Sequence, residues 1–406
     1  MTFALHDAIA ELATYNDDPA AGGITREVFT PTYERSVGFV SGLMRDAGLE
    51  VRRDAFGNLY GRLEGTDPSL PAVRTGSHFD TTLNAGRYDG VVGVLGAIEA
   101  IGALRDRGLR RPIEIVAFAG EEPRFVTGCI GSRAVMGDLS RADLDRLVDR
   151  DGVSLAQALA GAGFKPDDVD SAVWDPASVH AFVELHIEQG IVLESSGEQI
   201  GVVTAIAAPH DLRVTLRGAA DHAGATPMRL RRDALAGAAE AMVELEKLAV
   251  GSPSGTTVGT VGVLRVRPGA INVVPGEVEL DVDVRDSDGD ARQAVVDGFV
   301  AAVGVLAGRR GLTAVVDEIV RDEPGTCAPF IVEAVETACA SLGVTRRRMI
   351  SGAYHDALML SRKIPVGMLF VPSVGGISHH PDEHTEREDI DRGAAVLGEV
   401  LATLAH

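Results

Sequence analysis

Short apolar runs alternate with segments of helical periodicity through the first half of the chain. Residues 71–73, 113–119 and 179–185 resemble buried strands, and residues 91–104 carry apolar side chains at helical spacing. Strands that alternate with helices are typical of a mostly parallel sheet covered by helices. The alternation therefore predicts an α/β fold, and it places any ligand site at the carboxyl ends of the strands.

The pattern changes near residue 209. From there, strand-like and helical segments follow one another in the order β-α-β-β-α-β, which is the order of a ferredoxin-like unit. The segments are 211–217, 235–245, 256–266, 277–285, 291–306 and 312–320. After residue 321 the α/β pattern returns. We therefore expect a catalytic domain of residues 1–208 and 321–406, interrupted by a four-stranded lid or dimerisation domain at 209–320.

Composition and charge limit the binding partners and the cellular compartment that we expect for the protein. The net charge of −21 argues against nucleic acid, which needs basic patches. No apolar run approaches the roughly 20 residues that span a bilayer, and the N-terminal MTFALHDAIAEL is typical of an amphipathic helix, not a signal peptide. Cys129, Cys327 and Cys339 form no CxxC pair or disulfide framework. These features predict a cytoplasmic protein with neither nucleic-acid nor membrane partners.

A short, glycine-punctuated loop within residues 75–93 carries His78, Asp80 and Asp89. Imidazole and carboxylate groups are suitable ligands for a divalent metal. In the His-x-Asp pair, Asp80 can accept from the second ring nitrogen and fix the tautomer of His78. Asp89 could bridge two cations. The alternative interpretation is a polar loop with incidental acids.

Acidic and basic side chains also follow two later strands. Glu121 and Glu122 come after the strand at 113–119, and because adjacent carboxylates repel, they indicate a nearby cation. One can bind metal while the other acts as a general base; the alternative is a solvated acidic turn. His186 ends the next strand and is a plausible third ligand, although a lone histidine is more often structural. Gln189 offers an amide to a polar substrate.

Two further segments carry chemistry. Residues 378–381, Ser-His-His-Pro, follow a Gly-Gly turn and supply another possible ligand, or form a polar surface loop. The inserted domain contains His222, which could stabilise an oxyanion, and later Asn272 and Arg285. Arg285 has the planar fork that binds a carboxylate. Its alternative role is a salt bridge on the polar face of its strand.

Taken together, these segments resemble the M20 family of di-metal peptidases and amidases. Within it the chain is most similar to N-carbamoyl-L-amino-acid hydrolases, allantoate amidohydrolases and ureidoglycolate amidohydrolases. The motifs, in chain order, are GSHFDT, GRYDGVVGVLGAIEAI, GEEPRF, GCIGSR, VELHIEQG, DHAGATPM, RPGAINVVPG, SGAYHDA and GISHHPDEHT. The resemblance covers nearly the whole chain. Tyr354 stands where carbamoylases commonly have glycine, so it would shrink the carboxylate pocket or add a hydroxyl donor.

The resemblance implies two divalent metal ions per subunit, Zn2+, Mn2+ or Co2+. One would be held by His78, Asp89 and His186. The other would be held by Asp89, Glu122 and His379, since the family's ligand directly follows serine, which favours His379 over His380.

The resemblance also implies the remaining site residues. Asp80 would orient His78, Glu121 would be the general base, and His222 would reach the active site of a partner subunit in a homodimer. The implied substrate-binding residues are Gln189, Asn272, Arg285, Gly352 and Ala353.

The resulting prediction is a metal-dependent amidohydrolase of a linear ureido acid, of the N-carbamoyl-amino-acid or ureidoglycolate type. Attack of a water on the ureido carbonyl would release ammonia, and the carbamate left behind would break down to CO2 and an amine. Arg285 would supply the local positive charge that an anionic substrate needs on so acidic a protein. The alternatives are an allantoate amidohydrolase, an aminoacylase or dipeptidase on the same fold, and a non-catalytic metal-dependent binding protein.

Overall fold

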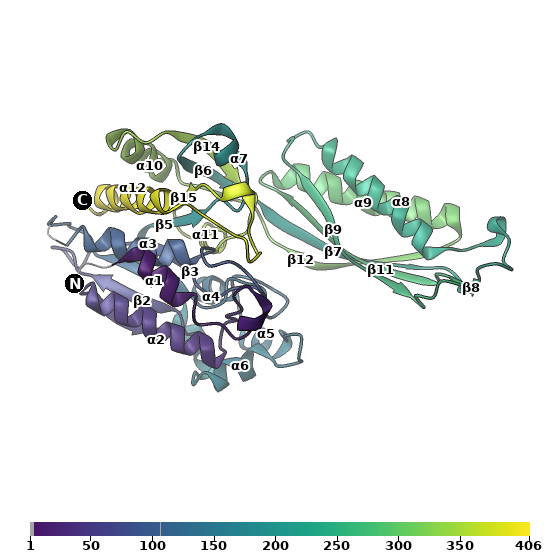
Figure 1. The fold of residues 1–406 in the computed structure, drawn as a ribbon, viewed down its shortest axis with the longest axis horizontal. Coiled ribbons are helices and arrows are strands. Elements are labelled where there is room, and N and C mark those ends of the chain that lie inside the picture. The colour runs from purple at the N-terminus through teal and green to yellow at the C-terminus, as the bar shows by residue number, and fades with distance from the viewer. Residues whose placement is uncertain (1–3, 106) are drawn as a thin grey trace. The chain divides into compact units, whose positions relative to one another are not determined.

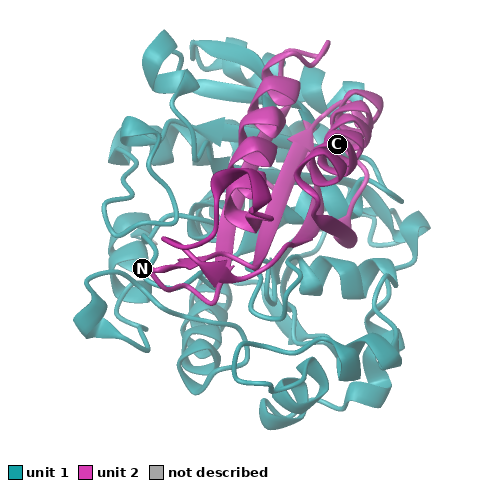
Figure 2. Ribbon diagram, turned by 90° about the vertical axis from the view of Figure 1, so that its right-hand side faces the viewer, with its two compact units in different colours: residues 1–205, 326–351, 355–406 teal, residues 206–325, 352–354 magenta. Residues whose placement is uncertain are grey.

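The chain forms two compact units (Figure 2). The computed structural model describes residues 4–105 and 107–406. Unit 1 comprises Met1–Ala205, Thr326–Ser351 and His355–His406, and unit 2 comprises Ile206–Gly325 and Gly352–Tyr354. The predicted domain boundaries, 208/209 and 320/321, fall close to these. That the two units act as a catalytic and a lid domain stays a prediction.

Unit 1 is built on a large mixed sheet with strand order β1-β2-β4-β3-β5-β15-β6-β13, and β14 pairs with β6. The four central strands, β4, β3, β5 and β15, are parallel, so their carboxyl ends meet at one edge. The strands are β1 (Glu50–Arg53), β2 (Leu59–Leu63), β3 (Ala72–His78), β4 (Ile113–Phe118), β5 (Val179–Ile187), β6 (Ile200–Ile206), β13 (Gly325–Thr326), β14 (Arg346–Ser351) and β15 (Val366–Val371).

Helices cover this sheet, as the α/β prediction requires (Figure 1). Helices α3 and α12 pack on each other and on β3 and β5. The helices of unit 1 are α1 (Leu5–Leu12), α2 (Pro31–Asp46), α3 (Val91–Gly102), α4 (Ile130–Met136), α5 (Arg141–Arg146), α6 (Leu155–Gly161), α7 (Val192–Ser196), α10 (Pro329–Ser341), α11 (Asp356–Leu360) and α12 (Arg387–Ala405). Its 3-10 turns are η1 (Pro19–Ala21), η2 (Pro166–Ala172), η3 (Pro176–Ser178) and η5 (Val374–Gly376).

Strand β3 is longer than its apolar run predicted. The loop was expected to carry His78, but the strand continues through Thr75 and Ser77 and ends at His78. These polar side chains can be buried because residues of the neighbouring strand β5 accept their hydrogen bonds. The Thr75 hydroxyl donates to the carbonyl of Val183 at 2.7 Å, and the Ser77 hydroxyl donates to Glu184 at 2.7 Å. His78 therefore lies on a rigid strand end, and only Asp80 and Asp89 lie in the loop.

Unit 2 confirms the predicted β-α-β-β-α-β order. Its antiparallel sheet has strand order β12-β7-β11-β9, and α8 and α9 enclose its core. The elements are β7 (Ala208–Arg217), β8 (Asp221–His222), η4 (Met228–Leu230), α8 (Ala234–Val250), β9 (Val258–Arg267), β10 (Val273–Val274), β11 (Glu277–Asp286), α9 (Gly289–Arg310) and β12 (Thr313–Arg321). In β11 the residues alternate between buried and half-buried, as their apolar-polar pattern predicted.

Helix α9 owes its apolar character to the core of unit 2. Among the described residues it is the one helix long and apolar enough, by length and composition, to cross a membrane. Phe299 and Val303 are fully buried against the sheet and α8. This packing accounts for the apolar side chains as those of a core helix.

We expect Phe299→Ala to lower the free energy of unfolding by about 3–5 kcal/mol, because the side chain is fully buried and its loss leaves a cavity. Urea unfolding followed by circular dichroism measures the change. Phe330→Ala is the matched control, since it removes the same side chain from a position that is 41% exposed. Equal losses for the two variants would contradict the assigned core of unit 2.

Candidate metal centre and active site

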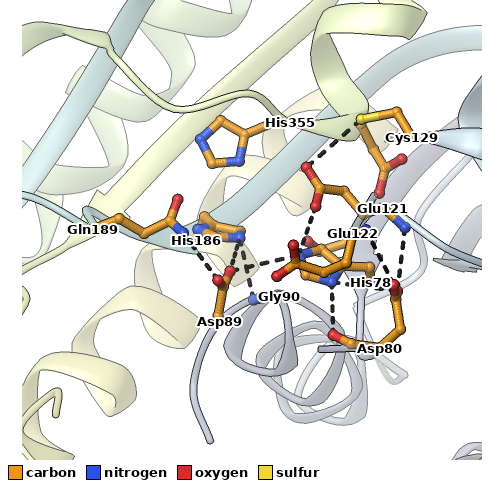
Figure 3. Close-up of polar contacts among 12 residues, drawn as sticks. His78, Asp80, Asp89, Gly90, Glu121, Glu122, Cys129, His186, Gln189 and His355 are labelled. Carbon is orange, nitrogen blue, oxygen red and sulfur yellow. Dashed lines mark hydrogen bonds and ion pairs between the residues drawn. The ribbon is translucent and has the colours of Figure 1, made fainter. Parts of the chain in front are cut away.

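The predicted side chains of unit 1 come together at the carboxyl ends of the parallel strands (Figure 3). His78 ends β3, Glu121 and Glu122 follow β4, and His186 lies near the end of β5. Asp89 lies just before α3, and His379 follows β15. Segments far apart in the chain thus converge because the strands that carry them are parallel neighbours.

Two groups of these residues are suited to hold metal ions. His78, Asp89 and His186 form one, and Asp89, Glu122 and His379 form the other; within each, one ligand atom per residue lies within 4.8 Å of the others. Asp89 belongs to both. Its Oδ1 lies 3.6 Å from His78 Nε2 and 3.2 Å from His186 Nε2, while its Oδ2 lies 3.1 Å from His379 Nε2. Asp89 thus faces both groups, with one carboxylate oxygen toward His78 and His186 and the other toward His379.

The histidines of the first group present their Nε2 atoms toward Asp89. His186 Nδ1 lies 2.9 Å from the carbonyl of Ile187, and His78 Nδ1 lies 3.2 Å from the carbonyl of Asp80. A carbonyl accepts only from a protonated nitrogen, so these contacts place a proton on each Nδ1 and turn each Nε2, the atom that would bind a metal, toward Asp89.

Gly90 lets the loop approach these rings. It has a φ of +65°, and a Cβ at this position would lie 2.5 Å from the His78 ring. A larger residue would push the ring out of place, so glycine is required by both the backbone conformation and the contact.

Asp80 supports two parts of the site at once. Its carboxylate accepts the backbone N–H groups of Glu121 at 3.2 Å and Glu122 at 3.1 Å, and its Oδ1 lies 3.5 Å from His78 Nδ1. It therefore orients the acidic pair after β4 as well as the ring of His78.

Glu121 lies beside the first group without belonging to either group. Its Oε2 is 3.8 Å from His78 Nε2, and its Oε1 is 3.6 Å from the thiol sulfur of Cys129 (Figure 3). Burial raises the pKa of Glu121 well above its usual range, and the carboxylates of Glu122 and Asp356 raise it further, against the opposing effect of His78. A buried carboxyl with this placement is suited to proton transfer.

The electrostatics of the groups match a divalent cation. Burial and the Asp89 carboxylate raise the pKa of Glu122 to about 7. Burial opposes the ionisation of Asp89, yet hydrogen bonds with His186, His379 and His78 hold its pKa well below its usual range. Several buried carboxylates facing imidazole nitrogens form a donor set that fits divalent metal ions, which would relieve the like-charge repulsion.

Gln189 lies at the edge of the second group. Its Nε2 donates to Asp89 Oδ2 at 2.9 Å and to the Ser378 hydroxyl at 3.2 Å. These contacts hold the side-chain amide of Gln189 against Asp89; its role in substrate binding stays a prediction.

Several buried residues behind the centre were missed by the sequence reasoning. Glu184, His186 and His355 form a third group of possible ligands among the described residues, but the oxygens of Glu184 are occupied by the Ser77 hydroxyl and by the N–H of Ala357, at 2.7 and 3.0 Å. Asp356 accepts from Ser132 at 2.6 Å. The motifs VELHIEQG and SGAYHDA contain these residues, but only the fold shows that they are buried beside the centre.

His222 and Asn272 lie together at one end of unit 2. Strands β8 and β10 pair with His222 opposite Val273, and the N–H of Ala223 donates to the carbonyl of Asn272 at 2.9 Å. His222 Nδ1 accepts the N–H groups of Gly224 and Ala225 at 3.0 and 3.1 Å. In the neutral ring these bonds assign the proton to the exposed Nε2, which makes it a hydrogen-bond donor.

Arg285 lies on β11 of the four-stranded sheet, near the Asp286 end of the strand and opposite Pro209 in the register. Its Nε contacts Asp283 at 2.8 and 3.0 Å, so the salt bridge considered from the sequence is present. Gly352 and Ala353 also belong to unit 2, with Tyr354. The Tyr354 hydroxyl donates to Asp322 at 2.7 Å, so this hydroxyl already has an acceptor within the unit.

The family model that describes peptidase family M20/M25/M40 matches residues 69–403. The chain belongs to this family. It is 42% identical to an N-carbamoyl-L-amino-acid amidohydrolase of Paenarthrobacter aurescens, across 98% of this chain and 96% of the relative. It is equally 42% identical to a ureidoglycolate hydrolase of Arabidopsis thaliana, across 99% of this chain and 86% of the relative.

A solved structure agrees with this assignment. The crystal structure of AtUAH in complex with glyoxylate matches with a TM-score of 0.88 and 42% identity, covering 99% of this chain and 97% of that one. The expected M20 fold and the expected hydrolase class are therefore confirmed, and the family is metal-dependent.

We expect Asp80→Asn to weaken metal binding by about 10–100-fold, because the amide loses the charge that orients His78 and presents an NH2 group toward the N–H groups of Glu121 and Glu122. Titration calorimetry with Zn2+ on the metal-free protein measures the affinities. Asp382→Asn is the matched control, since its side chain is 77% exposed. Wild-type affinity in Asp80→Asn would contradict the orienting role.

Proposed function

We propose that the protein is an amidohydrolase of linear ureido acids, of the N-carbamoyl-L-amino-acid or ureidoglycolate type, releasing ammonia and CO2. The observation that carries the proposal is the placement of Glu121. It is a buried carboxyl beside two ligand groups that share Asp89, and it belongs to neither. The names of the two relatives at 42% identity support the same substrate class.

The proposed metal ligands are His78, Asp89, Glu122, His186 and His379, holding two ions of Zn2+, Mn2+ or Co2+. When bound, such ions polarise the ureido carbonyl and lower the pKa of water. Carboxylate and imidazole ligands suit all three metals.

The protein's own groups then carry the proton transfers. Glu121 takes a proton from the attacking water and gives it to the nitrogen that leaves as ammonia. The Nε2–H of His222 donates to the oxygen that becomes negative. Arg285 binds the substrate carboxylate after exchanging Asp283 for it, since both acids use the same planar fork. Gln189, Asn272 and the backbone at Gly352 and Ala353 hold the remaining polar groups.

The layout of unit 2 supports a homodimer with composite sites. The stretch of β11 from Glu277 to Arg285 is about 26 Å long, at about 3.3 Å per residue. His222 follows the end of β7 and Asn272 follows the end of β9, and both strand ends pair with Glu277. At this end the N–H of Gly218 donates to the carbonyl of Gly276 at 2.8 Å. A carbamoyl amino acid is about as long as a dipeptide, about 7 Å. One substrate therefore meets His222, Asn272 and Arg285 only if two subunits supply them.

Exposed apolar surface on unit 2 is consistent with such a dimer. Strand β9 is at the edge of its sheet, with Val258 54% exposed and Leu264 42% exposed. A groove of about 680 Å3 runs between α8 and α9 beside Val243 and Val305. An open apolar edge strand readily pairs with a second chain.

We also propose the cytoplasm as the compartment. Cys129, Cys327 and Cys339 are all described and buried, and none forms a disulfide, as is usual for a reducing compartment.

We expect Glu121→Gln to abolish ammonia release from every ureido acid that the wild type hydrolyses, because the amide cannot accept the proton of the attacking water. The metal content, measured by elemental analysis, should stay at the wild-type value. The screen should include ureidoglycolate, allantoate, N-carbamoyl-β-alanine, N-carbamoyl-L-amino acids, and acyl amino acids and dipeptides for the alternative activities.

Glu333→Gln is the matched control, because Glu333 is exposed on α10. Wild-type ammonia release by Glu121→Gln would show that the mechanism is wrong. Hydrolysis confined to acyl amino acids or dipeptides would replace the ureido assignment with the aminoacylase or dipeptidase alternative.

We expect a mixed dimer of one His222→Ala subunit and one Glu121→Gln subunit to have about half the wild-type activity. If the lid crosses, one site keeps Glu121 of its own chain and receives His222 from the partner, while the other site lacks both. The two variant homodimers, assayed separately, provide the inactive baseline. An inactive mixed dimer of confirmed composition would exclude donation of His222 across the interface.

A further inference from the structure

Glu383 is a buried acid that neither the sequence reasoning nor the proposed reaction uses. Its residue is 4% exposed. One carboxylate oxygen, Oε1, accepts the backbone N–H groups of Tyr88 and Asp89 at 2.9 and 3.2 Å. The other, Oε2, accepts the hydroxyl of Ser378 at 2.8 Å.

These three bonds join two of the loops that carry the second ligand group, the loops of Asp89 and His379. Tyr88 and Asp89 belong to the loop before α3, and Ser378 directly precedes His379. Gln189 closes the arrangement into a ring, because its Nε2 donates both to the Ser378 hydroxyl at 3.2 Å and to Asp89 Oδ2 at 2.9 Å. The position of His379 relative to Asp89 therefore depends on the carboxylate of Glu383, which hydrogen-bonds to the backbone of one loop and to the Ser378 hydroxyl of the other.

Glu383 packs closely against Gly86. A Cβ on Gly86 would lie 2.3 Å from the Cβ of Glu383 and 2.4 Å from its Oε1, so the two loops meet this closely only because residue 86 is glycine. Glu383 also brings a further buried carboxylate next to Asp89, an arrangement that opposes ionisation of both. Both carboxylate oxygens of Glu383 accept hydrogen bonds, so glutamine, which has a single acceptor oxygen, would not replace it fully.

We propose that Glu383 is a positioning residue for the group formed by Asp89, Glu122 and His379, and that it sets the affinity of that group for a divalent cation. The proposal rests on the two-metal function described above. Supporting residues of this kind alter metal affinity by about 10–100-fold. The ion on His78, Asp89 and His186 should be affected less, because the rings of that group are oriented by the carbonyls of Asp80 and Ile187.

The test is the titration of Zn2+ into metal-free wild type and variants, with affinity and stoichiometry read by calorimetry. Glu383→Ala should lose about 10–100-fold in affinity for one of the two ions and keep the other near wild type. Glu383→Gln should fall between the two, because its carbonyl oxygen still accepts from Tyr88 and Asp89. Asp382→Ala is the matched control: it removes the neighbouring acid, whose side chain is 77% exposed, and should bind as wild type.

The proposal is wrong if Glu383→Ala binds both Zn2+ ions with wild-type affinity. If Glu383→Ala does not fold, Ser378→Ala decides. It removes the bond to Glu383 Oε2, together with the bond that Gln189 donates to the same hydroxyl, and it should weaken the same single ion. In that case, wild-type affinity for both ions in each of the two variants, Ser378→Ala and Glu383→Gln, would overturn the proposal. A wild type that binds two ions but hydrolyses no ureido acid would refute the proposed function and leave the role of Glu383 intact. A wild type that binds a single ion would overturn both.

Discussion

The arrangement of the centre depends on the carboxylate of Asp89. Its Oδ1 faces His78 and His186, and its Oδ2 faces His379. Three imidazoles from distant parts of the chain can meet one carboxylate only if the strands that carry them are neighbours in space. The parallel core β4-β3-β5-β15 provides this, because it ends the four strands at a single edge.

The residues that surround Asp89 act chiefly by fixing positions. Gly90 leaves room for the His78 ring, Asp80 holds both that ring and the acidic turn, and Glu383 ties the Asp89 loop to Ser378. The bonds that Asp80 accepts from the acidic turn and the bond that Glu383 accepts from the N–H of Asp89 are buried, where competing water is absent and a hydrogen bond holds its geometry most firmly. Such rigidity keeps Glu121 beside the two groups of possible ligands without its belonging to either.

Unit 2 separates the residues that the sequence suggested would act together. The alternation of β11 predicted that Arg285 lies on a polar face, and the structure shows Asp283 as its partner there. Asn272, however, lies beside His222 at the far end of the sheet. Sequence spacing says nothing about which end of a strand a loop occupies, so the separation of Arg285 from His222 and Asn272 emerges only from the strand register.

The sequence by itself determined the α/β class, the β-α-β-β-α-β insertion, and the family, because periodicity and motif order are local properties of the chain. Positions after strands suggested acidic and imidazole side chains as possible ligands, and the resemblance to the M20 family implied the set His78, Asp89, Glu122, His186 and His379. The sequence wrongly predicted that His78 lies in a loop. The polar residues of β3 are buried because they hydrogen-bond to a neighbouring strand, and such bonds cannot be predicted from the local sequence. Only the tertiary structure decided that Asp89 faces both groups, that Glu121 stands outside them, and that Glu383 joins their loops, since each depends on contacts between residues far apart in the chain.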